Sequence, residues 1–136
     1  MLSRWLSEED YRCRHCGLLP PDFEMVDRPM IYEILFGYYD DLCDDYGGKL
    51  PVSSGYRCWA NRQSQTALDA HLFAALDITQ PSADAVEKLF DHIREKYSFL
   101  RVGKNLSNLH AHIDTNYLVR PRPVPQYVQG AWWDET

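Results

Sequence analysis

The chain has 136 residues, of which 45% are hydrophobic and 25% charged, and its formal net charge at pH 7 is −6. This length allows one domain of ordinary size, and the composition is that of a globular rather than a disordered protein. The acidic balance and the scattered basic residues argue against a nucleic-acid partner, because phosphate binding depends on clustered lysine and arginine.

The first residues of the chain lack the apolar core of a secretory signal, and no apolar run reaches the roughly 18 residues of a membrane span. We therefore expect a protein without a membrane span that is synthesised in the cytoplasm. An extracellular target would be reached after release by lysis or from a virion. We expect residues 1–136 to form a single domain, with 117–136 as an extended tail that contains proline and tryptophan.

Residues 28–46 are predicted to form the main helix, because apolar residues recur there at the i, i+3 and i+4 spacing of one helix face. Gly47 and Gly48 end this helix. The opposite face is acidic, which is typical of a solvated surface, and carries Asp40, Asp41, Asp44 and Asp45.

Two short strands are predicted at residues 49–54 and 76–78, with a loop or broken helix over 60–70 between them. Asp77 then lies at the end of an apolar strand, where an ionised carboxylate is costly unless it is paired or bound to metal. A second helix begins after a cap at Ser82 and runs to about Tyr97.

Residues 99–102 and 109–115 are predicted as further strands joined by a turn at 103–105. Alternating polar and apolar residues place His110, His112 and Asp114 on one face of the later strand. We expect Trp132 and Trp133 to cover the surface rather than form an element. The predicted fold class is α+β, with a small antiparallel sheet and flanking helices.

These histidines and carboxylates are the ligand types that Zn²⁺ binds. A catalytic zinc ion takes three protein ligands and leaves a fourth position for water. His71, Asp77 and one histidine of the 110/112 pair would fill that role.

The four cysteines are Cys13, Cys16, Cys43 and Cys58. Cys13 and Cys16 form a C-x-x-C, which fits half of a structural zinc site, a redox pair or two thiols near a turn. Because Cys43 lies inside the main helix pattern and far from Cys58 in sequence, reduced and partly buried thiols are favoured over a four-cysteine zinc site.

Four motifs occur in a distinctive order: residues 6–13, then 54–58 with Asn61, then His71 with Asp77, and finally 110–114. This order resembles the zinc D-alanyl-D-alanine peptidases of the hedgehog-type fold, a family that includes bacterial carboxypeptidases and phage endolysins. The likeness spans roughly residues 6–116. It implies a hedgehog/DD-peptidase fold and zinc ligands at His71, Asp77 and His112.

The resemblance also implies that His110 lies beside the metal-bound water and that Arg57, in the Ser-Gly-Tyr-Arg motif with Tyr56, helps to bind substrate. These roles agree with the chemistry, since imidazole can move a proton and guanidinium can pair with a carboxylate or an oxyanion. Asp114, on the same strand face, is a candidate for orienting an imidazole.

The leading hypothesis is a zinc metallopeptidase that hydrolyses peptide bonds in peptidoglycan stem or cross-link peptides, as a carboxypeptidase or an endopeptidase. One alternative is a catalytically weakened peptidoglycan-binding or virion structural module of the same fold. It is favoured by the spacing of His71 and Asp77, which are six residues apart where the family has seven. A third hypothesis is a structural zinc protein that uses the four cysteines.

Overall fold

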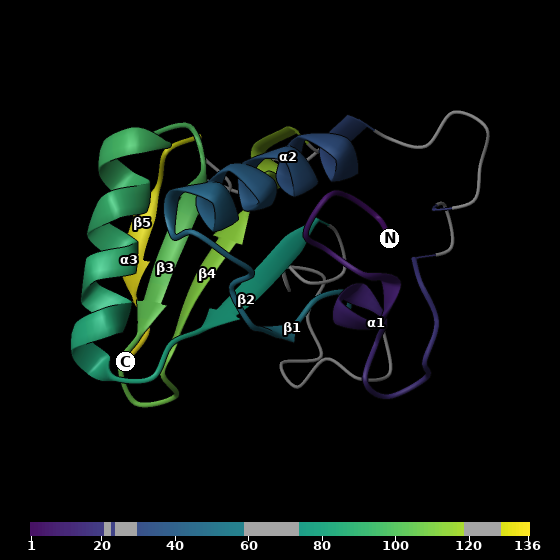
Figure 1. Cartoon of the computed structure of the whole chain (residues 1–136), viewed down its shortest axis with the longest axis horizontal. Helices are drawn as coiled ribbons and strands as arrows, with labels where there is room; N and C mark the ends of the chain where they lie inside the picture. The colour runs from purple at the N-terminus through teal and green to yellow at the C-terminus, as the bar shows by residue number, and fades with distance from the viewer. Residues whose placement is uncertain (21–22, 24–29, 59–73, 119–128) are drawn as a thin grey trace.

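The computed structural model describes residues 1–20, 23, 30–58, 74–118 and 129–136. Within them the chain has the predicted α+β class, with a five-stranded mixed sheet in the order β1-β2-β4-β3-β5 (Figure 1). The strands are β1 (Val52–Ser54), β2 (Ala75–Thr79), β3 (Arg101–Asn105), β4 (His110–Asp114) and β5 (Trp132–Asp134). The helices are α1 (Glu8–Tyr11), α2 (Met30–Asp45), α3 (Ala83–Lys96) and the 3-10 turn η2 (Asn116–Leu118).

The two long helices confirm the predictions made from apolar periodicity. α2 falls within the expected 28–46 and buries one stripe of apolar residues. α3 begins at the N-cap Ser82, whose Oγ accepts a hydrogen bond from the Ala85 N–H at 3.1 Å. No helix in the described ranges is long and apolar enough to cross a membrane.

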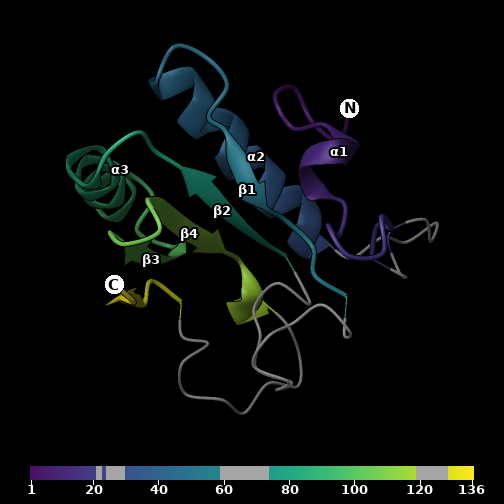
Figure 2. The ribbon, with the colours of Figure 1, turned by 90° about the horizontal axis from the view of Figure 1, so that it is seen from below.

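The short helix α1 is an element that periodicity did not indicate. Ser7 and Asp10 form a capping box, in which each side chain accepts a hydrogen bond from the backbone N–H of the other residue. α1 lies beside β1 (Figure 2), and its residue Tyr11 is fully buried. The capping box therefore places the start of the chain against the edge of the sheet.

Two predictions for the sheet are wrong. Residues 103–105 are not a turn, because β3 continues through Asn105 and the turn follows at 106–109, where Leu109 adopts a positive φ of 56°. Trp132 and Trp133 do form an element, since β5 pairs with β3 in parallel and makes the sheet mixed rather than antiparallel.

The acidic face of α2 is also not simply solvated. Asp40 accepts hydrogen bonds from Ser3 Oγ at 2.8 Å and from the Trp5 N–H at 3.0 Å, so it fixes the N-terminal segment. Asp45 contacts His92, Lys96 and Tyr97, which lie in or just after α3. These carboxylates join segments that are distant in sequence.

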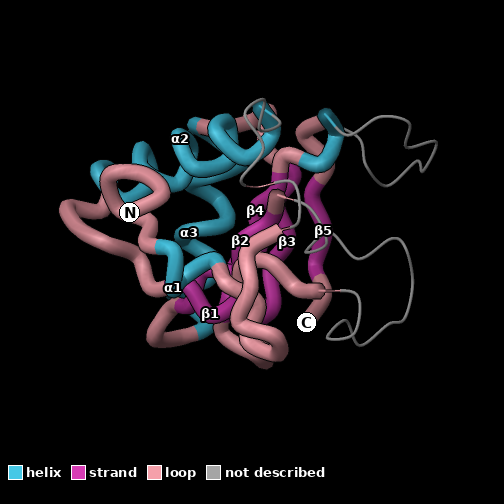
Figure 3. The backbone as a smooth tube through the Cα atoms, turned by 90° about the vertical axis from the view of Figure 1, so that its right-hand side faces the viewer, coloured by secondary structure: helices cyan, strands magenta, loops and turns pink. Residues whose placement is uncertain are grey.

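The sheet has one apolar face and one polar face over β2 and β4. Leu76, Ile78, Ala111 and Ile113 belong to the hydrophobic core. α2 and α3 lie together on one side of the sheet (Figure 3). Because side chains alternate along a strand, the residues between the core positions face the other side. That polar face carries the residues of the candidate site.

Candidate functional site

The strands β2 and β4 place a carboxylate opposite an imidazole. Their antiparallel register pairs Asp77 with His112, and Asp77 Oδ1 lies 3.1 Å from His112 Nδ1. The sequence indicated that Asp77 lies at the end of a strand, but it occupies the middle of β2. Its burial at 4% exposure still requires a charged partner, and His112 is one.

The other ring nitrogen of His112 is held by the next residue on the same face. Nε2 lies 2.6 Å from Asp114 Oδ2, and Asp114 also accepts from Arg101 Nη1 at 2.9 and 3.1 Å. Asp114 is fully buried, so Arg101 supplies the charge that balances it. Asp114, which the sequence predicted to orient an imidazole, thus contacts the imidazole of His112.

The carboxylates on both sides of His112 favour its protonated form. Burial alone lowers its pKa, but the hydrogen bonds to Asp114 and Asp77 outweigh burial and raise the pKa to about 10. The site is therefore a row of alternating charges across the sheet, which runs from Arg57 through Asp77, His112 and Asp114 to Arg101.

Arg57 reaches this row from the loop that follows β1. Its Nη2 donates to Asp77 Oδ2 at 3.2 Å and its Nε donates to Ser54 Oγ at 3.1 Å. Tyr56, predicted to contact substrate, is 7% exposed and belongs to the hydrophobic core. Its N–H donates to the Tyr11 carbonyl at 2.8 Å, so Tyr56 anchors the loop that presents Arg57.

His110 lies at the outer end of the same face. Its Nε2 is 3.8 Å from Asp77 Oδ1 and 3.0 Å from Glu135 Oε1. Trp133 Nε1 donates to the other Glu135 oxygen at 3.0 Å, and the Trp133 ring packs on His112 with centroids 5.4 Å apart. The hydrogen bond from His110 lowers the pKa of Glu135, against the opposing effect of partial burial.

Sequence reasoning missed Arg101, Trp133 and Glu135 as members of this face. The contact of Arg101 with Asp114 depends on the register of β3 with β4, which places the two residues opposite each other. Trp133 and Glu135 arrive through the parallel pairing of β5, a long-range contact that no local pattern indicates.

The structure brings together six of the seven predicted site residues around one part of the sheet or its supporting loop. They are Tyr56, Arg57, Asp77, His110, His112 and Asp114. The predicted ligand His71 lies outside the described residues. Of the three predicted zinc ligands, the structure describes Asp77 and His112, which are in contact.

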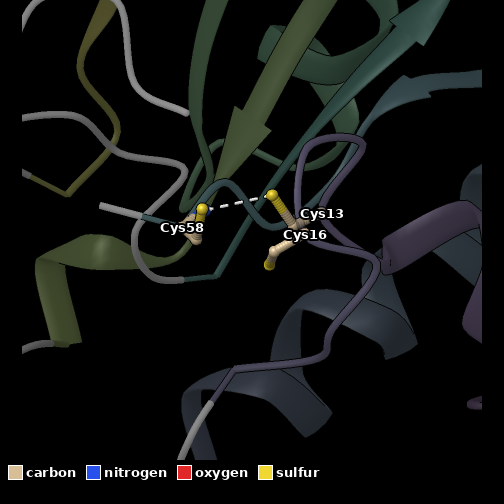
Figure 4. A group of neighbouring side chains, drawn as sticks. All are labelled: Cys13, Cys16 and Cys58. Carbon is tan, nitrogen blue, oxygen red and sulfur yellow. Dashed lines mark hydrogen bonds between the residues drawn. The ribbon is translucent and has the colours of Figure 1, made fainter. Parts of the chain in front are cut away.

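A second cluster includes Cys58, the residue that follows Arg57 in the chain. One ligand atom from each of Cys13, Cys16 and Cys58 lies within 4.8 Å of the others, so the three thiols could bind a metal ion (Figure 4). The sequence favoured reduced, partly buried thiols over a four-cysteine zinc site, and the structure groups three of the four free thiols. Cys43 is fully buried in α2, as its place in the helix pattern predicted.

The sulfur of Cys13 is surrounded by backbone donors. It accepts from the Cys58 N–H at 3.3 Å and from the His15 N–H at 3.4 Å. Burial raises the pKa of the Cys13 thiol, but hydrogen bonds to the sulfur, led by the N–H groups of Cys58, Cys16 and His15, outweigh it and lower the pKa to about 7.

Comparison with protein-family models, with curated proteins and with solved structures finds no match for this chain. The function therefore has to be argued from the two clusters themselves.

Proposed function

We propose that this chain is a zinc peptidase that hydrolyses peptide bonds in peptidoglycan stem or cross-link peptides and has the hedgehog/DD-peptidase fold. The observation that carries the proposal is the β2–β4 register, which sets Asp77 against His112 with His110 on the same face. His71, Asp77 and His112 would hold the ion. When bound, zinc supplies a water of lowered pKa and polarises the scissile carbonyl.

The contacts of His112 fit the function of a ligand. Asp114 accepts from the Nε2–H, and a zinc ion would take the place of the proton on Nδ1, the ring nitrogen that faces Asp77. Histidine ligands commonly donate their second ring N–H to a carboxylate, because this fixes the tautomer and raises the basicity of the ligating nitrogen. Arg101 completes this support by neutralising Asp114.

The remaining polar groups fit the handling of a peptide substrate. The imidazole of His110 is near Asp77 and would move a proton to or from the reacting groups. The guanidinium of Arg57 is on the opposite side of Asp77 and would pair with a substrate carboxylate or with the developing oxyanion.

One observation favours the second candidate, a catalytically weakened binding or virion module of the same fold. Both ring nitrogens of His112 and both oxygens of Asp77 already contact charged side chains of the chain. Such a network can stabilise the sheet without a metal.

The test measures zinc content and cleavage together. Purified chain is incubated with peptidoglycan fragments, and released amino groups and product masses are followed with and without a chelator. We expect cleavage that the chelator abolishes and zinc restores. His112→Ala is expected to abolish cleavage and remove about one zinc ion per chain, whereas His92→Ala, a histidine on α3, is expected to preserve both.

Full cleavage by metal-free protein, or by His112→Ala, would overturn the peptidase proposal. Binding to peptidoglycan without release of amino groups, even with zinc added, would favour the binding module.

A further inference from the structure

The three clustered cysteines come from two segments that are distant in sequence. Cys13 and Cys16 lie in the loop that follows α1, and Cys58 lies in the loop that follows β1 (Figure 4). Their ligand atoms are within 4.8 Å of one another. Three sulfurs at such separations can share one ion without a large rearrangement of the backbone.

Backbone hydrogen bonds fold the loop that carries Cys13 and Cys16 into a tight turn. The Gly17 N–H donates to the Cys13 carbonyl at 2.8 Å, and the Cys13 N–H donates to the Leu18 carbonyl at 3.0 Å. Gly17 has a φ of +73°, a conformation that residues with a Cβ rarely adopt. This tight turn brings Cys16 back toward Cys13.

The backbone donors on Cys13 point to a ligand function for its sulfur. The backbone N–H groups of His15 and Cys58 both donate to the sulfur of Cys13. Cys13 is only 1% exposed. N–H donors stabilise a thiolate, and the thiolate is the form of cysteine that binds metal. A surface pocket of about 580 Å³ opens beside this residue and is lined by Glu9, Arg12, Cys13, Arg14 and Gly17.

We propose that Cys13, Cys16 and Cys58 bind one Zn²⁺ ion as a structural centre. Thiolates select soft or borderline ions such as zinc over Mg²⁺ or Ca²⁺, and structural zinc is held in tetrahedral coordination. Three thiols become thiolates when the ion binds, and their protons pass to the buffer. The fourth position takes a donor other than these cysteines. This centre does not depend on the proposed peptidase function.

The centre joins the N-terminal segment to the loop that presents Arg57. The Tyr56 N–H donates to the Tyr11 carbonyl at 2.8 Å. A Cβ on Gly55 would come within 2.6 Å of Tyr11 Cα, so the two segments are in close backbone contact. Metal at Cys58, the residue after Arg57, would fix this contact and hold the guanidinium on Asp77.

A disulfide is the competing use of these thiols. A disulfide pairs two of the three cysteines and needs an oxidant that accepts two electrons, whereas a metal ion uses all three without oxidation. Thiol counting and mass measurement of the native chain separate these outcomes.

The experiment measures the zinc content of His112→Ala, purified in the presence of a mild reductant. This variant lacks a ligand of the proposed peptidase site. We expect about one zinc ion per chain. Adding Cys13→Ala, Cys16→Ala or Cys58→Ala is expected to reduce the zinc content to near zero. Cys43→Ala is the matched control, since Cys43 is buried outside this cluster, and it is expected to retain the ion.

A second measurement keeps all four cysteines and therefore does not depend on the folding of the cysteine variants. Co²⁺ replaces zinc in the His112→Ala chain, and we expect the visible spectrum of tetrahedral cobalt together with a thiolate-to-cobalt charge-transfer band. A thiol-modifying reagent should react with the three cluster cysteines only after a chelator removes the metal.

Three results would overturn the proposal: zinc content that is insensitive to the cluster variants, Co²⁺ binding without a thiolate band, or a native disulfide within the cluster. Failure of the peptidase proposal gives a different pattern. Wild type and His112→Ala would then carry equal zinc, and the cysteine variants alone would lose it.

Discussion

His112 Nδ1 lies 3.1 Å from Asp77 Oδ1, and this contact joins two strands through their buried charges. The same imidazole contacts Asp114 through Nε2, and Asp114 in turn pairs with Arg101. Because Asp114 is fully buried and Arg101 is 5% exposed, neither can be solvated by water if its partner is lost. The three strands β2, β4 and β3 are therefore coupled by charge as well as by backbone hydrogen bonds.

Asp114→Asn is expected to destabilise the protein strongly. The substitution leaves the buried guanidinium of Arg101 without its carboxylate, and breaking a buried pair in this way costs about 3–5 kcal/mol. The measurement is the free energy of unfolding in urea. Asp84→Asn is the control, because its pair with Lys88 is 77% and 76% exposed and its loss costs less than about 1 kcal/mol. Equal effects of the two substitutions would contradict the coupling.

Gly103→Ala is expected to displace Trp133 from the polar face. A Cβ at this position would collide with the indole ring of Trp133, which packs on His112. Overpacking of this kind costs about 1–3 kcal/mol. Tryptophan fluorescence and urea unfolding report the change. Gly37→Ala in α2 meets no neighbouring atom and should instead stabilise the chain by about 0.5–1 kcal/mol. A stabilising effect at Gly103 would show that Trp133 does not pack there.

The sequence predicted the parts of the fold that depend on local periodicity. The apolar stripes of α2 and α3 were readable because a helix that packs on a sheet must bury one face. The alternation at residues 109–114 predicted that three polar side chains share one face, because successive side chains of a strand point to opposite faces of the sheet. Residues 103–105 misled the prediction, because Gly103 is needed for the close approach of Trp133 rather than for a turn.

The contacts that complete the two clusters could not be predicted in this way. Glu135 reaches His110 only because β5 pairs with β3, and Arg101 reaches Asp114 only through strand register. Cys58 joins the C-x-x-C because Gly55 allows the loop after β1 to pack on Tyr11. Each of these contacts is set by tertiary packing between segments that are far apart in the chain.

Acid is expected to remove the stabilisation that Asp45 provides. Its carboxylate accepts from Lys96 at 2.6 Å, from Tyr97 at 2.6 Å and contacts His92 at 2.8 Å, which lowers its pKa well below the ordinary range. A depressed folded-state pKa gives stability that is complete above the unfolded value of about 3.9 and is lost as the pH falls through the folded value.

The measurement for Asp45 is the Tm of wild type and of Asp45→Asn at a series of pH values. The difference between them should be largest near neutral pH and should shrink between about pH 5 and pH 2. Asp41→Asn removes an exposed carboxylate one turn earlier on the same helix and should give a smaller difference at neutral pH. A constant Asp45 difference would refute the linkage.

His110→Ala is expected to raise the pKa of Glu135 toward its ordinary value of about 4.3. The hydrogen bond from His110 is the largest cause of the lowered pKa, and partial burial, the next largest cause, acts in the opposite direction. Carboxyl-carbon NMR of labelled glutamate follows the titration directly. His92→Ala, on α3, should leave the Glu135 curve unchanged.

Because the folded-state pKa of Glu135 is depressed, the stability that its contact with His110 contributes is present above about pH 4.3 and disappears as the pH falls below it. An unaltered Glu135 titration in His110→Ala would mean that the C-terminal strand does not present its carboxylate to the polar face.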